Sequence, residues 1–173
     1  MLFETPINLD LEDANVMYYP SFFHKTDSDH YLNSLLNEID WKQDNITVFG
    51  KTYLQPRLTA FFANNNTSYK YSNIFMHPYP FNHSLLEIKN QIEKHQNIKF
   101  TSCLANLYRH GQDSNGWHAD NEKELGEEPI IASVSFGVDR VFQLKHKHKK
   151  HLKVKLVLHH GSLLIMKGKT QKY

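Results

Sequence analysis

His118 and Asp120 are the residues whose types and spacing most directly suggest chemistry in this sequence. In a strand, residues two positions apart point to the same face, so an imidazole and a carboxylate would stand side by side. These groups are two of the three ligands of the facial triad that holds non-haem Fe(II) and leaves coordination positions open. A chain with this content of His and Asp contains roughly 0.6 such pairs by chance, so the hypothesis depends on the neighbouring residues.

A second polar pair, Asn106 and Tyr108, lies shortly before His118 in the sequence. On one strand face, an amide and a phenol can hydrogen-bond a polar ligand that lies inside a barrel. The alternative is a core tyrosine with a satisfied hydroxyl and an asparagine at a strand edge. The polar stretch 111–116 lets the chain reverse between the two pairs, so both pairs could line one cavity.

An acidic loop, residues 121–129, follows the His-x-Asp pair. Most of its carboxylates are expected to be solvated. Glu122 differs, because it lies two positions after Asp120 and would share its face in a strand. Its carboxylate could accept a hydrogen bond from an exocyclic amine of a bound base.

The segment 145–155 holds six Lys, three His and no acidic residue, although the net charge of the chain is only +2. It lies between two strand-like segments, so we expect a basic hairpin loop that runs into a strand. Such a concentration of Lys suits the phosphate backbone of a nucleic acid, and a solubilising loop is the alternative. The candidate backbone ligands are Lys145, Lys147, Lys149 and Lys150.

Two further segments place aromatic side chains beside cations. Phe49, Gly50 and Lys51 have the character of an exposed hairpin tip, whose ring could wedge into a base stack. An ordinary half-buried strand end is the alternative. Tyr69 and Tyr71 share one strand face and could stack on a flipped base, or could simply form a core pair.

Two helices and a series of short strands must position these groups. The first helix is capped by Thr26 or Asp27 and runs to Ile39, and the second is capped by Asn82 or Ser84 and runs to Ile92. Alternation and turn signals predict strands at 100–108, 130–136, 139–145, 152–158 and 162–166. Helices first and short strands later predict an α+β domain with a β-sandwich or barrel-like core.

The length of 173 residues suits one domain, 1–173, with a full core. Cys103 is the only cysteine, which excludes an intramolecular disulfide and favours a reducing compartment. The N-terminus lacks the features of a signal peptide, and no run approaches the roughly 18 apolar residues of a membrane span. We therefore expect an intracellular monomer without a membrane partner, cytoplasmic if the chain is bacterial and nuclear if it is eukaryotic.

Five blocks of the sequence resemble the AlkB family of Fe(II)/2-oxoglutarate-dependent nucleic-acid dealkylases, in order and over residues 15–173. The blocks are 55–62, 106–108, 118–122, 131–137 and 160–166. The last two, IASVSFG and HGSLLIM, are much more specific than His-x-Asp. The resemblance is greatest to the DNA-repair branch that acts on double-stranded DNA. It implies a double-stranded β-helix, or jelly roll, with the N-terminal helices packed on it.

The resemblance also implies roles for individual residues. His118 and Asp120 would bind iron, and Asn106 and Tyr108 would contact 2-oxoglutarate. Phe49, with its neighbours Gly50 and Lys51, would fill the gap left by a flipped base. The base pocket would be lined by Tyr69, Tyr71, Asn121 and Glu122. With 2-oxoglutarate and O2 as co-substrates, such enzymes hydroxylate the N-alkyl group of bases such as 1-methyladenine and 3-methylcytosine in DNA, and an aldehyde is released.

The family pattern continues beyond Tyr173 to a second iron-binding His and to two Arg, one of which pairs with 2-oxoglutarate. His159 and His160 precede that position, and His160 matches a structural residue of the HGSLL block, so neither is predicted to bind iron. The sequence therefore predicts a dioxygenase domain truncated at its C-terminus. Two alternatives remain: a catalytically inactive homologue that binds nucleic acid through 145–155 and Phe49, and a dealkylase that acts on RNA or protein.

Overall fold

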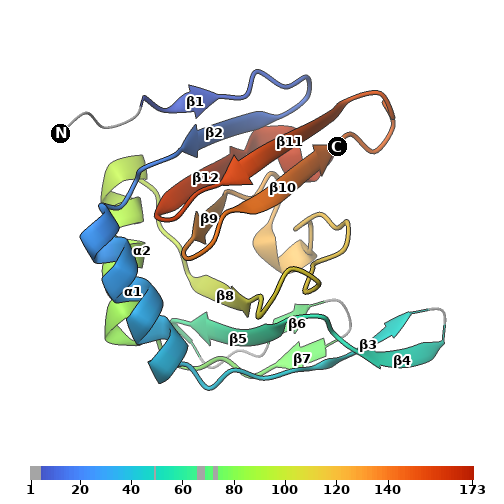
Figure 1. Cartoon of the computed structure of the whole chain (residues 1–173). Coiled ribbons are helices and arrows are strands. Elements are labelled where there is room, and N and C mark those ends of the chain that lie inside the picture. Colours follow the sequence, from blue (N-terminus) through green and yellow to red (C-terminus); the bar gives the residue numbers. More distant parts are fainter. Residues whose placement is uncertain (1–4, 49, 66–68, 72–73) are drawn as a thin grey trace. The chain divides into compact units, whose positions relative to one another are not determined.

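The computed structural model describes residues 5–48, 50–65, 69–71 and 74–173 (Figure 1). These residues form two compact units. The first contains the chain up to Ser34 together with His118–Tyr173, and the second is Leu35–Trp117. Neither helix of the described residues combines the length and apolar character needed to cross a membrane.

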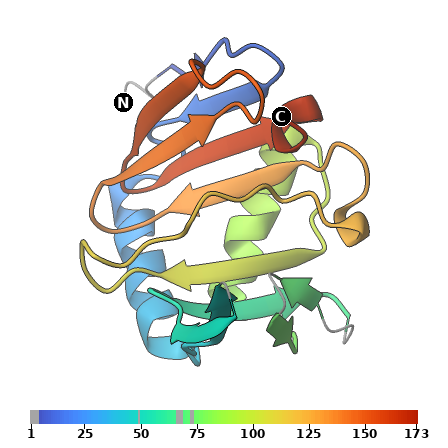
Figure 2. The ribbon, with the colours of Figure 1, turned by 90° about the vertical axis from the view of Figure 1, so that its right-hand side faces the viewer.

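A four-stranded antiparallel sheet and a separate hairpin make up most of the first unit (Figures 1 and 2). The sheet has the order β1 (Ile7–Asn8), β2 (Asn15–Tyr19), β12 (Ser162–Lys167), β9 (Ile131–Ser135). The hairpin pairs β10 (Arg140–Lys145) with β11 (Lys153–Leu158). The unit also contains two short 3-10 helices, η1 (Lys123–Leu125) and η2 (Gly168–Gln171), and helix α1 (Lys25–Glu38) as far as Ser34.

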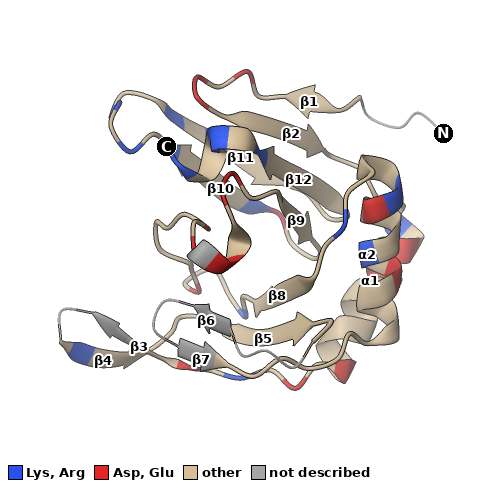
Figure 3. Cartoon of the chain, turned by 180° about the vertical axis from the view of Figure 1, so that it is seen from behind, with Lys and Arg blue, Asp and Glu red and all other residues tan. Residues whose placement is uncertain are grey.

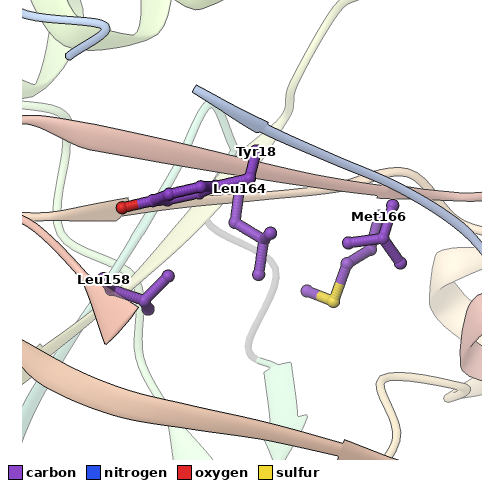
Figure 4. Close-up of a cluster of buried hydrophobic side chains, with 5 residues drawn as sticks. Tyr18, Leu158, Leu164 and Met166 are labelled. Carbon is purple, nitrogen blue, oxygen red and sulfur yellow. The ribbon is translucent and has the colours of Figure 1, made fainter. Parts of the chain in front are cut away.

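Strand β12 is the centre of this unit because it is paired on both sides, with β2 and with β9. Leu163, Leu164 and Ile165 are completely buried, which explains why the sequence here is a continuous apolar run. Leu164 and Met166 gather with Tyr18 of β2 and Leu158 of β11 in one core cluster (Figure 4). Burying each such side chain contributes about 1.5–3 kcal/mol to folding.

Gly161 and His160, just before β12, join the sheet to helix α1 (Lys25–Glu38). Gly161 has φ of +79°, and a Cβ atom there would lie 2.3 Å from Ser28 Oγ and 2.9 Å from the Phe23 carbonyl oxygen. His160 Nδ1 accepts a hydrogen bond from the Gly137 amide at 2.8 Å, and its Nε2 lies 3.1 Å from Asp29 Oδ1. His160 is therefore a structural residue, as the sequence predicted.

The second unit consists of three antiparallel hairpins and helix α2 (His83–Gln96). The hairpins are β3 (Asn45–Val48) with β4 (Lys51–Leu54), β5 (Leu58–Ala63) with β8 (Ser102–Leu107), and β6 (Tyr69–Tyr71) with β7 (Ile74–Met76). Asn82 caps α2, since its side chain accepts a hydrogen bond from the Leu85 amide at 2.9 Å.

The end of α2 is tied to the start of β8 by a buried carboxylate. Glu93 is only 5% exposed and accepts hydrogen bonds from Lys89 and Lys99 and from the Phe100 amide. Burial opposes ionisation of Glu93, but these donors outweigh it and lower the pKa of its carboxyl to about 2. The unit therefore keeps this carboxylate charged in its interior.

The sequence predicted the type of most elements, but the cap expected at Thr26 or Asp27 is wrong, since α1 already begins at Lys25. The strands expected at 100–108, 130–136, 139–145, 152–158 and 162–166 correspond to β8, β9, β10, β11 and β12. The described residues are rich in sheet and contain two α-helices, as an α+β domain should be. The strand geometry by which His118 and Asp120 would share a face is absent, since these residues lie in irregular chain. Tyr108 lies one residue beyond the end of β8.

Candidate functional site

His118 and Asp120 lie close together although no strand aligns them. His118 Nε2 is 3.7 Å from Asp120 Oδ1, and the two side chains are 41% and 24% exposed. The backbone is held at this point by Gln171 of η2, whose Oε1 accepts a hydrogen bond from the Asp120 amide at 2.9 Å. Gln171 is buried and its Nε2 contacts Met166 Sδ at 3.6 Å. The backbone at Asp120 is thus held by a side chain from 51 residues further along the chain.

The surroundings of Asp120 fit a bound cation. Burial raises the pKa of the Asp120 carboxyl, His118 opposes this rise, and the Glu122 carboxylate adds to it. Glu122 Oε2 is buried and has no hydrogen-bond partner among the described residues. A carboxylate removed from water is costly unless a cation or a donor meets it. The arrangement therefore suits a divalent cation on His118 and Asp120 and a hydrogen-bond donor on Glu122.

Among the described residues, no third His, Cys, Asp or Glu joins this pair in an arrangement that could hold a metal ion. The described part of the chain therefore brings together two side chains that could serve as metal ligands, His118 and Asp120. Their chemistry, one imidazole and one carboxylate, is that of the facial triad of non-haem iron.

In the second unit, Asn106 is held by Arg57, for which no role was predicted from the sequence. Arg57 is only 5% exposed, and its Nε donates to Asn106 Oδ1 at 2.8 Å. Its Nη1 donates to Asn115 Oδ1 at 2.6 Å. Asn106 itself is exposed on β8, opposite Thr59 of β5, and Tyr108 is half-buried. The side chain of Asn106 is therefore fixed at one end and open to solvent.

The polar stretch 111–116 after Tyr108 forms a turn that hydrogen bonds hold in place. Asp113 is 2% exposed and accepts three hydrogen bonds from Arg109: from the backbone amide at 2.9 Å, from Nε at 2.8 Å and from Nη2 at 3.0 Å. These hydrogen bonds hold the pKa of the Asp113 carboxyl well below its ordinary range. The next amide, that of Ser114, donates to the Pro56 carbonyl at 2.8 Å, which brings Asn115 to Arg57.

The predicted base-binding residues are spread over both units. Gly50 and Lys51 are exposed where β3 turns into β4, and Gly50 has φ of +75°, as a hairpin tip requires. Phe49 lies outside the described residues, and Tyr69 and Tyr71 belong to β6, whose side chains are also not described. In the first unit, Asn121 is exposed beside Glu122.

The basic segment forms the loop of the β10–β11 hairpin, as predicted (Figure 3). Lys145, His146, Lys147, Lys150 and Lys153 line a cavity of about 230 Å³. None of the described residues that line this cavity is acidic, which favours an anion as its ligand.

Two lysines of the loop are engaged inside the protein. Lys149 Nζ pairs with Asp13 Oδ2 at 3.0 Å and with Glu12. Lys147 Nζ donates to the carbonyls of Lys172, at 2.8 Å, and of Gln171, at 3.2 Å. Within this loop, Lys147 and Lys149 therefore already have partners inside the protein.

Comparison with known proteins shows which protein family this chain belongs to. Residues 15–173 match the model of the 2OG-Fe(II) oxygenase superfamily. The chain is 41% identical over 167 residues to the human alpha-ketoglutarate-dependent dioxygenase alkB homolog 3, covering 91% of this chain and 58% of the relative. It is 36% identical over 185 residues to the DNA oxidative demethylase ALKBH2 of Arabidopsis thaliana, covering 92% of this chain and 59% of the relative.

The human DNA oxidative demethylase ALKBH2 is 32% identical over 162 residues, with 88% of this chain and 62% of the relative covered. The chain therefore belongs to the AlkB family of the 2OG-Fe(II) oxygenases. It spans about three fifths of the length of these relatives. Oxygenases of this superfamily have a jelly-roll fold, with which the sheet-rich structure agrees.

Proposed function

We propose that the full-length protein is an Fe(II)/2-oxoglutarate-dependent dioxygenase that removes N-alkyl groups from bases in DNA. The observation that carries this proposal is the His118–Asp120 pair, with Asp120 half-buried and the unpartnered Glu122 Oε2 beside it. Relatives that are named as an alpha-ketoglutarate-dependent dioxygenase and as DNA oxidative demethylases support the reaction and the substrate class.

Fe(II), 2-oxoglutarate and O2 supply the oxidising chemistry, which hydroxylates the N-alkyl carbon so that an aldehyde leaves. His118 and Asp120 hold the metal through an imidazole nitrogen and a carboxylate oxygen. Asn106 and Tyr108 bind 2-oxoglutarate by hydrogen bonds. Glu122 accepts a hydrogen bond from the exocyclic amine of the base, which would satisfy its buried oxygen.

The remaining predicted residues would bind the nucleic acid. The base pocket is completed by Tyr69, Tyr71 and Asn121, and the hairpin tip Phe49, Gly50 and Lys51 takes the place of the flipped base. In the β10–β11 loop, Lys145, Lys147 and Lys150 line the basic cavity and bind phosphate. Lys149 adds to the positive field but is held by Glu12 and Asp13.

Residues 1–173 would form a single dioxygenase domain with a double-stranded β-helix core and the helices packed on it. The protein would act as a monomer, and DNA would be preferred to RNA. The number of Lys residues in the loop and the hairpin tip favour a nucleic-acid substrate over a protein.

The metal assignment is tested with His118→Ala in the full-length protein. Loss of an imidazole ligand should abolish Fe(II)-dependent decarboxylation of 2-oxoglutarate, measured as CO2 or succinate release, and should weaken Mn(II) binding. The matched control is His159→Ala, because His159 is an exposed histidine that contacts Asp139 at 2.9 Å. Turnover of His118→Ala equal to that of the control would refute the assignment.

A catalytically inactive nucleic-acid-binding protein is the second candidate. It is favoured by the cavity whose described lining residues are all basic, since such a surface needs no metal to bind DNA. Salt-dependent DNA binding by a full-length protein that neither binds Mn(II) nor decarboxylates 2-oxoglutarate would establish this second function instead.

A further inference from the structure

Arg57 is a buried cation whose partners are unusual. It is 5% exposed, and the side-chain hydrogen bonds that it makes to described residues go to two neutral amide oxygens, Asn106 Oδ1 and Asn115 Oδ1. Within the described residues, no carboxylate forms an ion pair with Arg57. A buried guanidinium normally has a carboxylate partner, so a structural role in an ion pair does not account for this residue.

The guanidinium determines which way the Asn106 amide faces. Arginine carries only donors, whereas an asparagine side chain has one accepting oxygen and one donating NH2 group. The atom of Asn106 that faces Arg57 Nε must therefore be the oxygen, at 2.8 Å. The reversed amide would set one donor against another and leave both without a partner.

With its oxygen on Arg57, Asn106 presents its NH2 group elsewhere. That group contacts the Leu104 carbonyl at 3.3 Å, an exposed contact that uses one of its two hydrogens. The group offered for binding is thus a donor, close to the positive charge of Arg57. A carboxylate accepts hydrogen bonds and carries negative charge, so this is the orientation that an acidic co-substrate requires.

The turn that contains Asp113 and Ser114 also holds Asn115 in place beside Arg57. Asp113 fixes the turn through its three hydrogen bonds from Arg109, and the Ser114 amide anchors the turn to Pro56. Asn115 is thereby held where its oxygen meets Arg57 Nη1 at 2.6 Å. The Arg57 guanidinium donates to both amide oxygens. A rotation of Arg57 away from Asn106 would therefore break both hydrogen bonds.

We propose that Arg57 is a positioning residue that orients the Asn106 amide so that its NH2 group donates to a carboxylate of 2-oxoglutarate. This inference rests on the proposed function, in which Asn106 binds that co-substrate. It assigns to Arg57 no contact with the reacting atoms. The affinity for 2-oxoglutarate then depends on the orientation of the Asn106 amide and not only on the presence of an asparagine at this position.

The decisive variants are Asn106→Asp and Asn115→Asp in the full-length protein. Each keeps an oxygen acceptor on Arg57 and adds one negative charge to the same guanidinium. Only Asn106→Asp replaces the donor that faces the co-substrate with a repelling oxygen. We expect it to weaken 2-oxoglutarate binding at least about tenfold, as loss of a hydrogen bond to a charged group does, and Asn115→Asp to weaken it less than about threefold.

Calorimetric binding of 2-oxoglutarate to the Mn(II)-loaded protein gives these affinities without turnover, and thermal unfolding reports folding. Arg57→Met, which frees the amide to reverse, should lower the affinity by about three- to tenfold, with Mn(II) affinity unchanged. Equal losses in the two Asn→Asp variants, or an affinity of Asn106→Asp within twofold of wild type, would overturn the inference. If Arg57→Met does not fold, the two Asn→Asp variants still decide. Wild-type protein that binds Mn(II) but no 2-oxoglutarate would instead refute the proposed function.

Discussion

Strand β12 and the segment around His118 and Asp120 belong to the same unit but are held in different ways. β12 forms ladders with β2 and β9, and its central side chains are fully buried. The backbone of the His118–Asp120 segment is anchored by the hydrogen bond from the Asp120 amide to Gln171. The first region resists change through many small contributions, whereas the second depends on a few specific contacts. Stability and metal geometry should therefore respond to different mutations.

Leu164→Ala should give the largest effect, and on stability alone. Removing a fully buried leucine from the cluster of Tyr18, Leu158 and Met166 leaves a cavity and should cost about 2–5 kcal/mol of unfolding free energy. Urea unfolding measures this loss. The affinity of the folded fraction for Mn(II) should be unchanged, and a large fall in that affinity would break the distinction between the two regions.

Gln171→Ala should show the opposite behaviour. Loss of the contacts with the Asp120 amide and Met166 Sδ should cost about 1–3 kcal/mol of stability, less than the loss expected for Leu164→Ala. Metal affinity should fall about tenfold, as it does when groups that orient metal ligands are removed. Mn(II) titration, followed by calorimetry, measures this change. An unchanged affinity would show that the backbone at Asp120 is fixed without Gln171.

The smallest effects are expected in the β10–β11 loop. Lys150→Ala should reduce the salt dependence of DNA binding by about 0.9 in the logarithmic slope, because one phosphate contact is lost. Lys149→Ala serves as the matched control, since its ammonium is paired with Glu12 and Asp13. It should leave the slope nearly unchanged and change the stability little, because exposed ion pairs contribute little. The same change of slope in both variants would show that Lys149 contacts phosphate in spite of its ion pairs with Glu12 and Asp13.

The sequence predicted those features that depend on local pattern. The apolar run of β12, the alternation of β8 and the Asn82 cap of α2 all follow from residues within a few positions of one another. The spacing of His118 and Asp120 singled them out, but they lie in irregular chain rather than in a strand, and the Asp120 backbone amide is held by Gln171, a contact that spacing does not reveal.

Arg57 and Gln171 could not have been assigned from sequence. Each acts on a residue about 50 positions away, so no local periodicity marks it. Arg57 lies inside a block that resembles the family, yet its burial and its two amide partners become visible only when the chain is folded. Contacts of this kind depend on tertiary structure, which propensities and periodicity do not encode.

Gly161 has a consequence for the sequences that this fold can accept. A larger residue there would overlap Ser28 Oγ, which a substitution at position 28 could relieve, and the Phe23 carbonyl oxygen, which no substitution can remove. Its positive φ adds a second restriction. A second substitution at position 28 therefore cannot make a larger residue acceptable at position 161. In a library randomised at 28 and 161 together, every stable clone should retain glycine at 161, whereas position 28 should vary among small residues.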